Sequence, residues 1–437
     1  MSSGTREMAL YIAGRFAGHV RQDENGSLSF SYAPDYLGAP VSLFMPLSPM
    51  TYRQHVVRPY LMGLLPDDPT VRADIADRYG CSGENPFALL SHIGLDCPGA
   101  VQIVPESERA LIDSRVGRLI ELSAKEMEDT IRAMRLRSSS PWQIYGQSER
   151  WSLGGAQSKI ALRLTRGTWY RCEGDAATTH ILKPGVSGYK NQALDEHLCL
   201  RLAASIGLPA AHTSFVSFVS FGAESAVVIE RYDRVTGDDG SVTRIHQEDL
   251  CQALCVDPSR KYAEQGGPST PDVLALLAKT GRHAPANLRT FTLFLIFNYL
   301  VGATDAHAKN YSLLLGTRGL ARLAPLYDVA SIAPYQTLAP RRRKPLRAAM
   351  SIGGENRFGR LGQEHLRKLA ADPALANSGV GYDWLMASAR RMAEMVPGAL
   401  REVVHESAKD GLAGIEVVGP LLEREVSANC RRLLERL

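Results

Sequence analysis

Two side chains in the segment Ala303-Thr-Asp-Ala-His-Ala-Lys-Asn310 carry oxygen atoms at a spacing that suits phosphoryl transfer. Asp305 and Asn310 are separated by four residues, which is the D-x-x-x-x-N spacing of loops that move a phosphoryl group onto a hydroxyl. In such loops the aspartate accepts the proton of the hydroxyl, and the asparagine supplies an oxygen to magnesium. The same residues also suit a loop that merely ends a helix with caps, so the spacing alone does not decide.

A second carboxylate favours the phosphoryl-transfer interpretation. Asp328 follows Asn310 after a stretch that reads as two short strands around Gly316 and Gly319. Carboxylate, amide and phosphate oxygens are the ligands that Mg²⁺ prefers, so Asn310 and Asp328 are the predicted metal ligands. The alternative is that Asp328 is a turn residue that starts the next segment.

A lysine that reaches the phosphates is the next requirement of this chemistry. Lys183 ends the apolar strand pattern Thr179-His-Ile-Leu-Lys-Pro184, where its ammonium can reach the α- and β-phosphates of a nucleotide. Glu196 on the following predicted helix is its natural partner, and Asp195 remains open as an alternative. Without this context Lys183 is equally well an ordinary surface lysine.

The segment from Ser152 to Lys159 contains two adjacent glycines and precedes a predicted strand. Glycine allows backbone N–H groups to approach phosphate oxygens, although the segment matches neither the G-x-G-x-x-G pattern nor a Walker loop. The predicted phosphate-binding residues of this loop are Gly154, Gly155, Ala156, Gln157, Ser158 and Lys159.

Two further segments are candidates for nucleotide contacts. Glu230-Arg231-Tyr232 ends an apolar strand at the point where a hinge would present backbone groups to adenine. His307 lies two residues after Asp305 and is interpreted as a loop-orienting or nucleotide-contacting residue rather than a metal ligand. His246 is expected to orient or cap a helix that begins near residue 248.

The elements that must position these residues divide the chain into a β-rich first half and a helical second half. Strands are predicted at 8–13, 27–32, 41–45, 100–104, 160–164, 168–172, 179–184 and 226–232, with Asn25-Gly26 as a hairpin turn between the first two. Helices are predicted at 52–64, 70–79, 85–93, 123–133 and 193–206, and most of the chain after residue 247 reads as helical. This division is the outline of a two-lobed kinase.

Bulk composition is compatible with this outline. The 437 residues are enough for two or three domains, and 45% hydrophobic with 22% charged residues is ordinary for globular proteins. The net charge of +4 is compatible with a nucleotide or nucleic-acid partner. The seven cysteines have irregular spacings and are expected to be reduced thiols. The longest apolar run, 291–303, is interrupted by Asn298 and too short to span a bilayer, so we expect a soluble, cytoplasmic protein with no membrane partner.

Other chemistries fit less well. The sequence contains no G-x-S-x-G, no H-E-x-x-H and no paired C-x-x-C, which disfavours a serine hydrolase, a zinc protease and a structural zinc site.

Taken together, the segments resemble the HipA family of toxin kinases. Ser152-Leu-Gly-Gly-Ala-Gln-Ser-Lys159 is similar to the phosphate loop of the family, and the 179–184 segment is similar to its lysine strand. The segments 302–312 and 326–331 are similar to its catalytic loop and its metal-binding segment, and 246–254 with Lys261-Tyr262 and Gly266-Gly-Pro268 to a signature whose role is less certain. Segments at 41–47, 63–67, 72–76 and 94–100 resemble the family's extra N-terminal subdomain, so the resemblance covers nearly the whole chain.

The resemblance implies an α+β, protein-kinase-like two-lobed fold of the HipA type with an extra N-terminal β-rich subdomain and an all-α C-lobe. The implied domains are an N-terminal subdomain at 1–120, a kinase N-lobe at 121–235 and a C-lobe at 236–437. The implied cofactors are ATP and Mg²⁺, and Lys309 and Tyr327, within the matching segments, join the implied nucleotide site.

The resemblance also implies an activity and its partners. The activity is transfer of the ATP γ-phosphoryl group to a serine of a protein such as glutamate–tRNA ligase, an aminoacyl-tRNA synthetase, which inhibits translation and causes growth arrest and persistence. The implied partners are a helix-turn-helix antitoxin of the HipB type and, through it, operator DNA. The implied autophosphorylation site is Ser152, and Ser158 is a second hydroxyl in the same loop.

Two rival interpretations differ in class. The first is a non-catalytic nucleotide-binding corepressor that bridges antitoxin dimers on DNA, and the intact Asp305, Asn310, Asp328 and Lys183 argue against it. The second is a kinase for a small molecule or lipid head group. The basic cluster 341–347 is read first as solvated surface, with a contact to DNA or to an acidic substrate as the alternative.

Overall fold

A computed structural model describes residues 5–114, 116–136, 150–186, 188–218, 224–336 and 346–437. The chain folds into two units that interleave along the sequence. Unit 1 contains residues 1–183, 230–260 and 313–321, and unit 2 contains residues 184–229, 261–312 and 322–437. The basic cluster predicted at 341–347 lies outside the described residues except for its last two positions.

Unit 1 begins with a five-stranded antiparallel sheet in the order β4-β3-β2-β1-β5. Its strands are β1 (Arg6–Ile12), β2 (Arg15–Gln22), β3 (Leu28–Tyr32), β4 (Tyr52–Arg53) and β5 (Val101–Pro105).

The predicted pairing of the first two strands is wrong because an unpredicted strand, β2, lies between them. The β1–β2 turn is formed by Ala13 and Gly14, both with positive φ (51° and 71°). Alanine at the first turn position is not a typical hairpin residue, so nothing in the sequence indicated this turn. The Asn25-Gly26 turn is confirmed, but it joins β2 to β3.

The strand predicted at 41–45 is also wrong, since this segment forms only an isolated bridge between Ser42 and Met45. Side chains satisfy its backbone instead of a neighbouring strand. The Leu43 N–H donates to Glu248 (2.8 Å), and the Val41 N–H donates to the Tyr32 hydroxyl (2.7 Å). The segment is therefore held as an ordered loop.

Three short helices complete this part of unit 1 and confirm the predicted positions: α1 (Gln54–Gly63), α2 (Pro69–Tyr79) and α3 (Pro86–Ile93). The side-chain caps of α2 and α3 are local in sequence. Asp68 accepts from the Thr70 N–H and Asn85 from the Ala88 N–H, and each cap is followed by proline at the first helical position.

Within unit 1, a second antiparallel sheet has the order β9-β7-β8-β6. Its strands are β6 (Gly117–Leu122), β7 (Ile160–Thr165), β8 (Thr168–Gly174) and β9 (His180–Lys183). The sequence predicted the last three and missed β6. Helix α5 (Ala124–Arg135) starts with a capping box between Ser123 and Glu126. The remaining elements of unit 1 are the strands β12 (Arg234–Thr236), β13 (Val242–Arg244) and β14 (Gln247–Asp249), helix α8 (Leu250–Ala253), and most of β15 (Ser312–Leu315).

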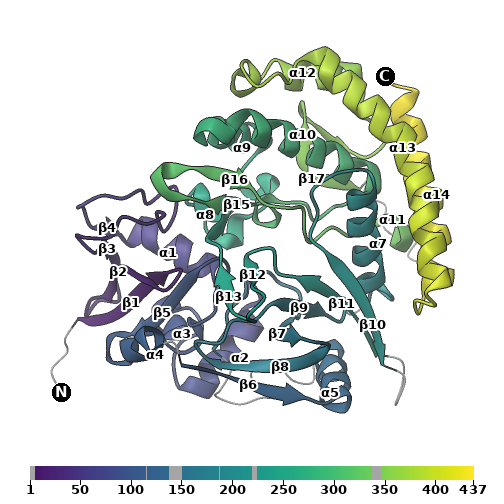
Figure 1. Ribbon diagram of the computed structural model, residues 1–437. Coiled ribbons are helices and arrows are strands. Elements are labelled where there is room, and N and C mark those ends of the chain that lie inside the picture. Colours follow the sequence, from purple (N-terminus) through teal and green to yellow (C-terminus); the bar gives the residue numbers. More distant parts are fainter. Residues whose placement is uncertain (1–4, 115, 137–149, 187, 219–223, 337–345) are drawn as a thin grey trace. The chain divides into compact units, whose positions relative to one another are not determined.

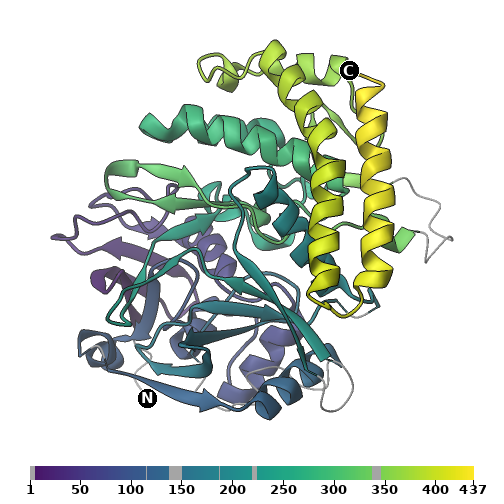
Figure 2. The ribbon, with the colours of Figure 1, turned by 45° about the vertical axis from the view of Figure 1, so that its right-hand side comes forward.

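Unit 2 is mainly helical and confirms the helical second half. Its helices are α7 (Gln192–Ser205), α9 (Thr270–Leu277), α10 (Ala284–Val301), α11 (Ala333–Gln336), α12 (Gln363–Ala370), α13 (Tyr382–Lys409) and α14 (Ile415–Leu434). Helices α13 and α14 run side by side as a long hairpin (Figures 1 and 2). The strands β10 (Thr213–Phe218) and β11 (Glu224–Glu230) pair antiparallel, as do β17 (Arg347–Ile352) and β18 (Glu355–Arg357). The strand β16 (Ala321–Leu323) completes the set.

The apolar run 291–303 is confirmed as a buried helix, α10, rather than a bilayer span. Among the residues that the structure describes, no helix combines the length and apolar character needed to cross a membrane.

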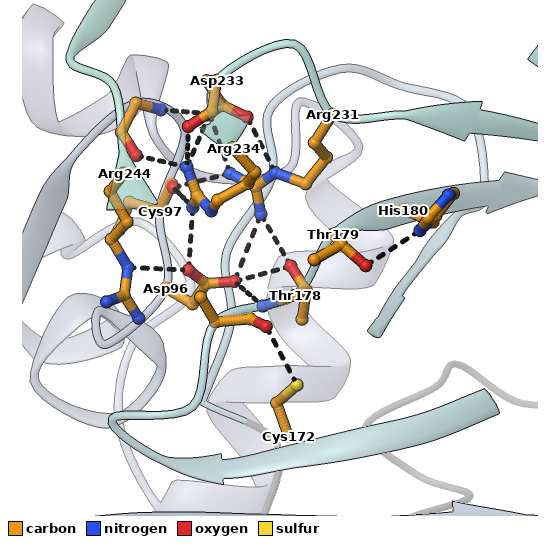
Figure 3. A network of polar contacts seen from close by, with 12 residues as sticks. Asp96, Cys97, Cys172, Thr178, Thr179, His180, Arg231, Asp233, Arg234 and Arg244 are labelled. Carbon is orange, nitrogen blue, oxygen red and sulfur yellow. Dashed lines mark hydrogen bonds and ion pairs between the residues drawn. The ribbon is translucent and has the colours of Figure 1, made fainter. Parts of the chain in front are cut away.

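A buried network of charged side chains joins distant parts of unit 1 (Figure 3). Arg231 forms ion pairs with Asp96 (3.2 Å) and Asp233 (2.9 Å), and Arg234 forms them with the same two carboxylates (2.8 and 3.0 Å). Arg244 adds a third guanidinium at 3.3 Å from Asp96. All five side chains are at most 9% exposed, so each charge depends on its partners for stabilisation.

Burial by itself would raise the pKa of Asp96, but Arg234, Arg231 and Arg244 together hold it well below its usual range. A carboxylate with a depressed pKa stabilises the folded state above its unfolded pKa of about 3.9, and this contribution disappears as the pH falls toward the folded-state value. Asp96 is therefore expected to stabilise unit 1 at neutral pH and to lose that effect in acid.

Replacing Asp96 tests this network. We predict that Asp96→Asn lowers the free energy of unfolding at pH 7 by about 3–5 kcal/mol, because it leaves buried guanidinium groups without a full counter-charge. The difference from wild type should shrink as the pH falls below about 4. Urea unfolding at pH 7 and in acid measures both values. Asp77→Asn, at an exposed position on α2, is the control and should unfold like wild type. A difference in the free energy of unfolding between Asp96→Asn and wild type that does not change with pH would contradict the stabilising role of the ionised Asp96.

Candidate active site

The loop that carries Asp305 is anchored to the end of α10, a largely buried helix of unit 2. Helix α10 ends at Gly302, whose left-handed conformation (φ 75°) lets the chain leave the helix axis at once. The Ala303 N–H closes this end by donating to the carbonyl of Asn298 (2.9 Å), and the Asn429 side chain donates to the carbonyl of Leu300 (3.1 Å). Asp305 therefore stands three residues beyond a rigid support.

Asp305 and Asn310 lie together in this loop. The side-chain amide of Asn310 donates to the backbone carbonyl of Asp305 (2.7 Å), and the His307 N–H donates to the same oxygen (2.8 Å). The Asp305 side chain is 65% exposed, whereas Asn310 and His307 are buried. His307 Nε2 lies 3.7 Å from Asp305 Oδ1. The arrangement offers one accessible carboxylate on a loop that the neighbouring side chains hold in shape.

The segment that carries Asp328 is tied to this loop. The Tyr327 hydroxyl contacts the carbonyl of Lys309 and the hydroxyl of Ser312, each at 2.8 Å. The two predicted metal ligands therefore lie next to this contact in the sequence, because Asn310 follows Lys309 and Asp328 follows Tyr327. Asp328 itself has a positive φ of 58°, a conformation that costs a non-glycine residue free energy and that tends to persist where a side chain must be aimed.

The donor set fits a magnesium ion. Because the Nδ2 of Asn310 donates to the carbonyl of Asp305, the amide is oriented with Oδ1 as its remaining ligand atom. An amide oxygen with the carboxylate of Asp328 and nucleotide phosphates is a typical Mg²⁺ environment. Within the described ranges, no group of three or more histidine, cysteine or acidic side chains is arranged to hold a metal.

The glycine-containing loop of unit 1 begins from a buried anchor. Ser152 is fully buried, its hydroxyl donates to the carbonyl of Leu64 (2.7 Å), and its N–H donates to the carbonyl of Asp96 (3.1 Å). The loop then rises to the surface, where Ala156 is exposed and Gly154, Gly155, Gln157 and Ser158 are partly exposed.

Gly155 gives this loop its shape. Its φ of 100° favours glycine, and an added Cβ would come within 2.5 Å of Lys159 Nζ. The Lys159 ammonium donates to the carbonyl of Gly154 (2.5 Å). The Asp67 N–H donates to the carbonyl of Gly155 (3.1 Å), and the Gly155 N–H donates to Oδ1 of Asp67 (3.3 Å). Phosphate binding by this loop stays a prediction.

Lys183 is buried at the end of β9 in unit 1, and Glu196 is fully buried on α7 in unit 2. Their pairing remains a prediction. The alternative partner, Asp195, has other contacts. The Cys199 thiol donates to it at 3.4 Å, and burial raises its pKa to about 8 despite that bond and a backbone hydrogen bond from Ser331. Glu196 as the lysine partner, with Asp195 as the alternative, stays a prediction.

The predicted hinge residues have different surroundings. The Arg231 guanidinium is occupied by the buried network, and the Arg231 N–H donates to the carbonyl of Thr179 (2.9 Å), so the structure gives this residue a structural role. Glu230 is exposed, and the Tyr232 hydroxyl donates to Gln247 (2.5 Å). Adenine binding by Glu230 or Tyr232 stays a prediction.

His246 does not cap the following helix. Its Nε2 contacts the carbonyl of Val41 (3.0 Å), whereas Asp249 caps α8 by accepting from the Gln252 N–H.

The mixed α+β fold and the D-x-x-x-x-N loop define the class of the molecule as a protein-kinase-like phosphotransferase. Comparison with known proteins gives the family. The HipA-like C-terminal domain matches residues 151–406, and the HipA N-terminal domain matches residues 8–104. The chain belongs to the HipA family and is, by this homology, a serine/threonine-protein kinase.

Individual relatives agree with this assignment. The chain is 35% identical over 354 residues to Y4mE of Sinorhizobium fredii, a protein named as a candidate kinase, covering 80% of this chain and 81% of that one. It is 29% identical over 379 residues to the serine/threonine-protein kinase toxin HipA of Shewanella oneidensis, covering 84% and 81%. A chain in the solved complex of HipA, HipB and operator DNA from Shewanella oneidensis MR-1 superposes with a TM-score of 0.80 at 26% identity, covering 98% and 97%.

The magnesium assignment can be tested with Asp328. We predict that Asp328→Ala abolishes the part of ATP affinity that depends on Mg²⁺, because it removes the carboxylate ligand and leaves only the amide of Asn310. Calorimetric titration with ATP in the presence and absence of Mg²⁺ measures the effect. Asp410→Ala, an exposed aspartate at the end of α13, should bind like wild type. Equal Mg²⁺ dependence in Asp328→Ala and wild type would rule out this ligand.

Proposed function

We propose that the chain is the toxin of a toxin–antitoxin pair and transfers the γ-phosphoryl group of ATP to a serine of a protein substrate. The observation that carries this proposal is the exposed carboxylate of Asp305 on a loop whose carbonyl is held by Asn310 at 2.7 Å. A general base must lie within hydrogen-bonding reach of the acceptor hydroxyl, and an exposed carboxylate on a fixed loop meets that need.

Each residue has a role in the proposed reaction. Asp305 accepts the hydroxyl proton as the acceptor oxygen attacks, while Asn310 and Asp328 hold Mg²⁺. The metal, when bound, neutralises charge on the phosphates. Lys183, placed by Glu196, contributes a fixed positive charge to phosphate binding, and the loop from Gly154 to Lys159 contributes backbone N–H groups.

The partners follow by analogy with the Shewanella oneidensis complex, which contains HipA, HipB and operator DNA. We propose that this chain pairs with a helix-turn-helix antitoxin of the HipB type and reaches operator DNA through it. The proposed protein substrate is an aminoacyl-tRNA synthetase such as glutamate–tRNA ligase, whose inhibition stops translation and leads to persistence. With these proposed partners, the proposed location of the protein is the cytoplasm.

Removal of the base is the direct test. We predict that Asp305→Ala lowers phosphoryl transfer by about 10²- to 10⁴-fold, the usual effect of losing a well-placed base. Its exposed position predicts that the fold and ATP binding survive. Labelled ATP with host lysate, followed by mass spectrometry of the labelled protein, measures transfer and names the substrate.

The same experiment distinguishes a kinase from a non-catalytic corepressor. A non-catalytic corepressor that bridges antitoxin dimers on DNA would show no difference between wild type and Asp305→Ala in any assay. Transfer by Asp305→Ala at the wild-type rate would instead show that another group is the base.

Phosphorylation of the loop is a second prediction of this function. We propose Ser152 as the autophosphorylation site, with Ser158 as the alternative. A phosphate adds a charge of about −1.5 to −2, which the fully buried site of Ser152 cannot accommodate beside the carbonyl of Leu64. Phosphorylated Ser152 should therefore leave its position and take the loop with it.

We predict that protein phosphorylated at Ser152 binds ATP at least about tenfold more weakly than unphosphorylated protein, because the loop is both displaced and negatively charged. Ser152→Ala and Ser158→Ala form a matched pair, of which only the first should abolish the modification in intact-mass spectra. Unchanged ATP affinity in a homogeneously phosphorylated sample would refute the displacement.

A further inference from the structure

A tyrosine outside the catalytic loop contacts the proposed base directly. Tyr262 belongs to the loop before α9 and lies in the Lys261-Tyr262 signature to which the proposed function gives no role. Its phenol hydroxyl donates a hydrogen bond to Oδ1 of Asp305. Both residues belong to unit 2, so this contact lies within one compact unit.

The Tyr262 ring is itself held against the catalytic loop. It packs edge-on against the imidazole of His307, with ring centroids 4.7 Å apart and an interplanar angle of 87°. The His307 side chain is 3% exposed, and its Nε2 lies 3.7 Å from the same Asp305 oxygen that Tyr262 contacts. Two aromatic side chains therefore converge on one carboxylate oxygen.

The backbone around Tyr262 forms a closed turn. Its carbonyl accepts the N–H groups of Gln265 (2.9 Å) and Gly267 (3.0 Å), and Gly266 has the left-handed φ of 79° that this turn requires. The next residues start α9, which Ser269 caps by accepting from the Asp272 N–H. Tyr262 is thus presented by a firm support that is separate in sequence from the catalytic loop.

This support meets a need that the catalytic loop alone does not meet. The Asn310 hydrogen bond fixes the backbone of Asp305, but the side chain is 65% exposed and has two rotatable torsions of its own. Misplacing a catalytic group by about 1 Å can cost on the order of 10²-fold in rate. The phenol of Tyr262 contacts the carboxylate itself and restricts these torsions.

We propose that Tyr262 is a positioning residue for Asp305, which holds the carboxylate of the base in one orientation. The inference rests on the proposed function, since it assumes that Asp305 is the base. The residue acts on Asp305 and takes no part in the transfer itself.

The test is Tyr262→Phe, which keeps the ring on His307 and removes only the hydroxyl. We expect kcat to fall about 10- to 100-fold, the worth of one hydrogen bond to a charged group. KM for ATP should stay at the wild-type value, because the hydroxyl serves the base and not the nucleotide. Tyr382→Phe, whose hydroxyl contacts only Arg367 among the described residues (3.4 Å), is the matched control.

Two outcomes would overturn the proposal. Wild-type kcat in Tyr262→Phe would show that the hydrogen bond is not used. A parallel loss of ATP affinity and thermal stability would show that Tyr262 is merely structural. Asp305→Ala, measured alongside, separates the two levels. Transfer by Asp305→Ala at the wild-type rate would show that Asp305 is not the base, and wild-type kcat in Tyr262→Phe beside an inactive Asp305→Ala would overturn the positioning role alone.

Discussion

The hydrogen bond from the side-chain amide of Asn310 to the backbone carbonyl of Asp305 is the contact on which the account of the active site depends. It closes the loop between the two residues and at the same time orients the amide with its oxygen as the remaining ligand atom. One contact thus fixes the proposed base and one proposed metal ligand together. This contact can fix the loop because the loop starts from the rigid end of α10, which Gly302 and Asn298 form.

The other constraints extend this rigidity. Tyr327 ties the segment of Asp328 to the carbonyl of Lys309, so the second metal ligand is not independent of the first. In unit 1, Asp96 contributes its side chain to the buried arginine network and its backbone carbonyl to Ser152. This residue belongs to the stretch that matches the HipA N-terminal domain, whereas Arg231 and Ser152 belong to the stretch that matches the C-terminal domain. The network therefore links the two matched regions inside one unit.

Signals that are local in sequence were sufficient for much of this architecture. The caps Asp68 and Asn85 mark the starts of α2 and α3, and Gly302 marks the end of α10. The D-x-x-x-x-N spacing predicted correctly that Asp305 and Asn310 lie in one loop, because the geometry of such a loop is set by its own few residues. Strand β2 was missed, since its turn begins with alanine rather than asparagine or glycine.

Features that depend on contacts between distant residues could not be predicted. The ion pair between Asp96 and Arg231 spans 135 positions, and nothing near either residue indicates that both charges are buried. The hinge prediction for Arg231 therefore gave no sign that its side chain belongs to a buried ion-pair network. Tyr262 lies 43 positions from Asp305, and its place in a recurrent signature was the one hint of a role. The burial of Ser152 likewise depends on Leu64, 88 positions away.

The central claim is that Asn310 and Asp328 hold the magnesium ion of a bound ATP while Asp305 and Lys183 act on the same nucleotide. A crystal structure with Mg²⁺ and a non-hydrolysable ATP analogue measures this directly. The account predicts metal–oxygen distances of about 2.0–2.1 Å to Asn310 Oδ1 and to an Asp328 carboxylate oxygen, with the Lys183 ammonium in contact with phosphate oxygens. A nucleotide whose metal is bound by other side chains, with Asp328 and Asn310 outside its coordination shell, would contradict it.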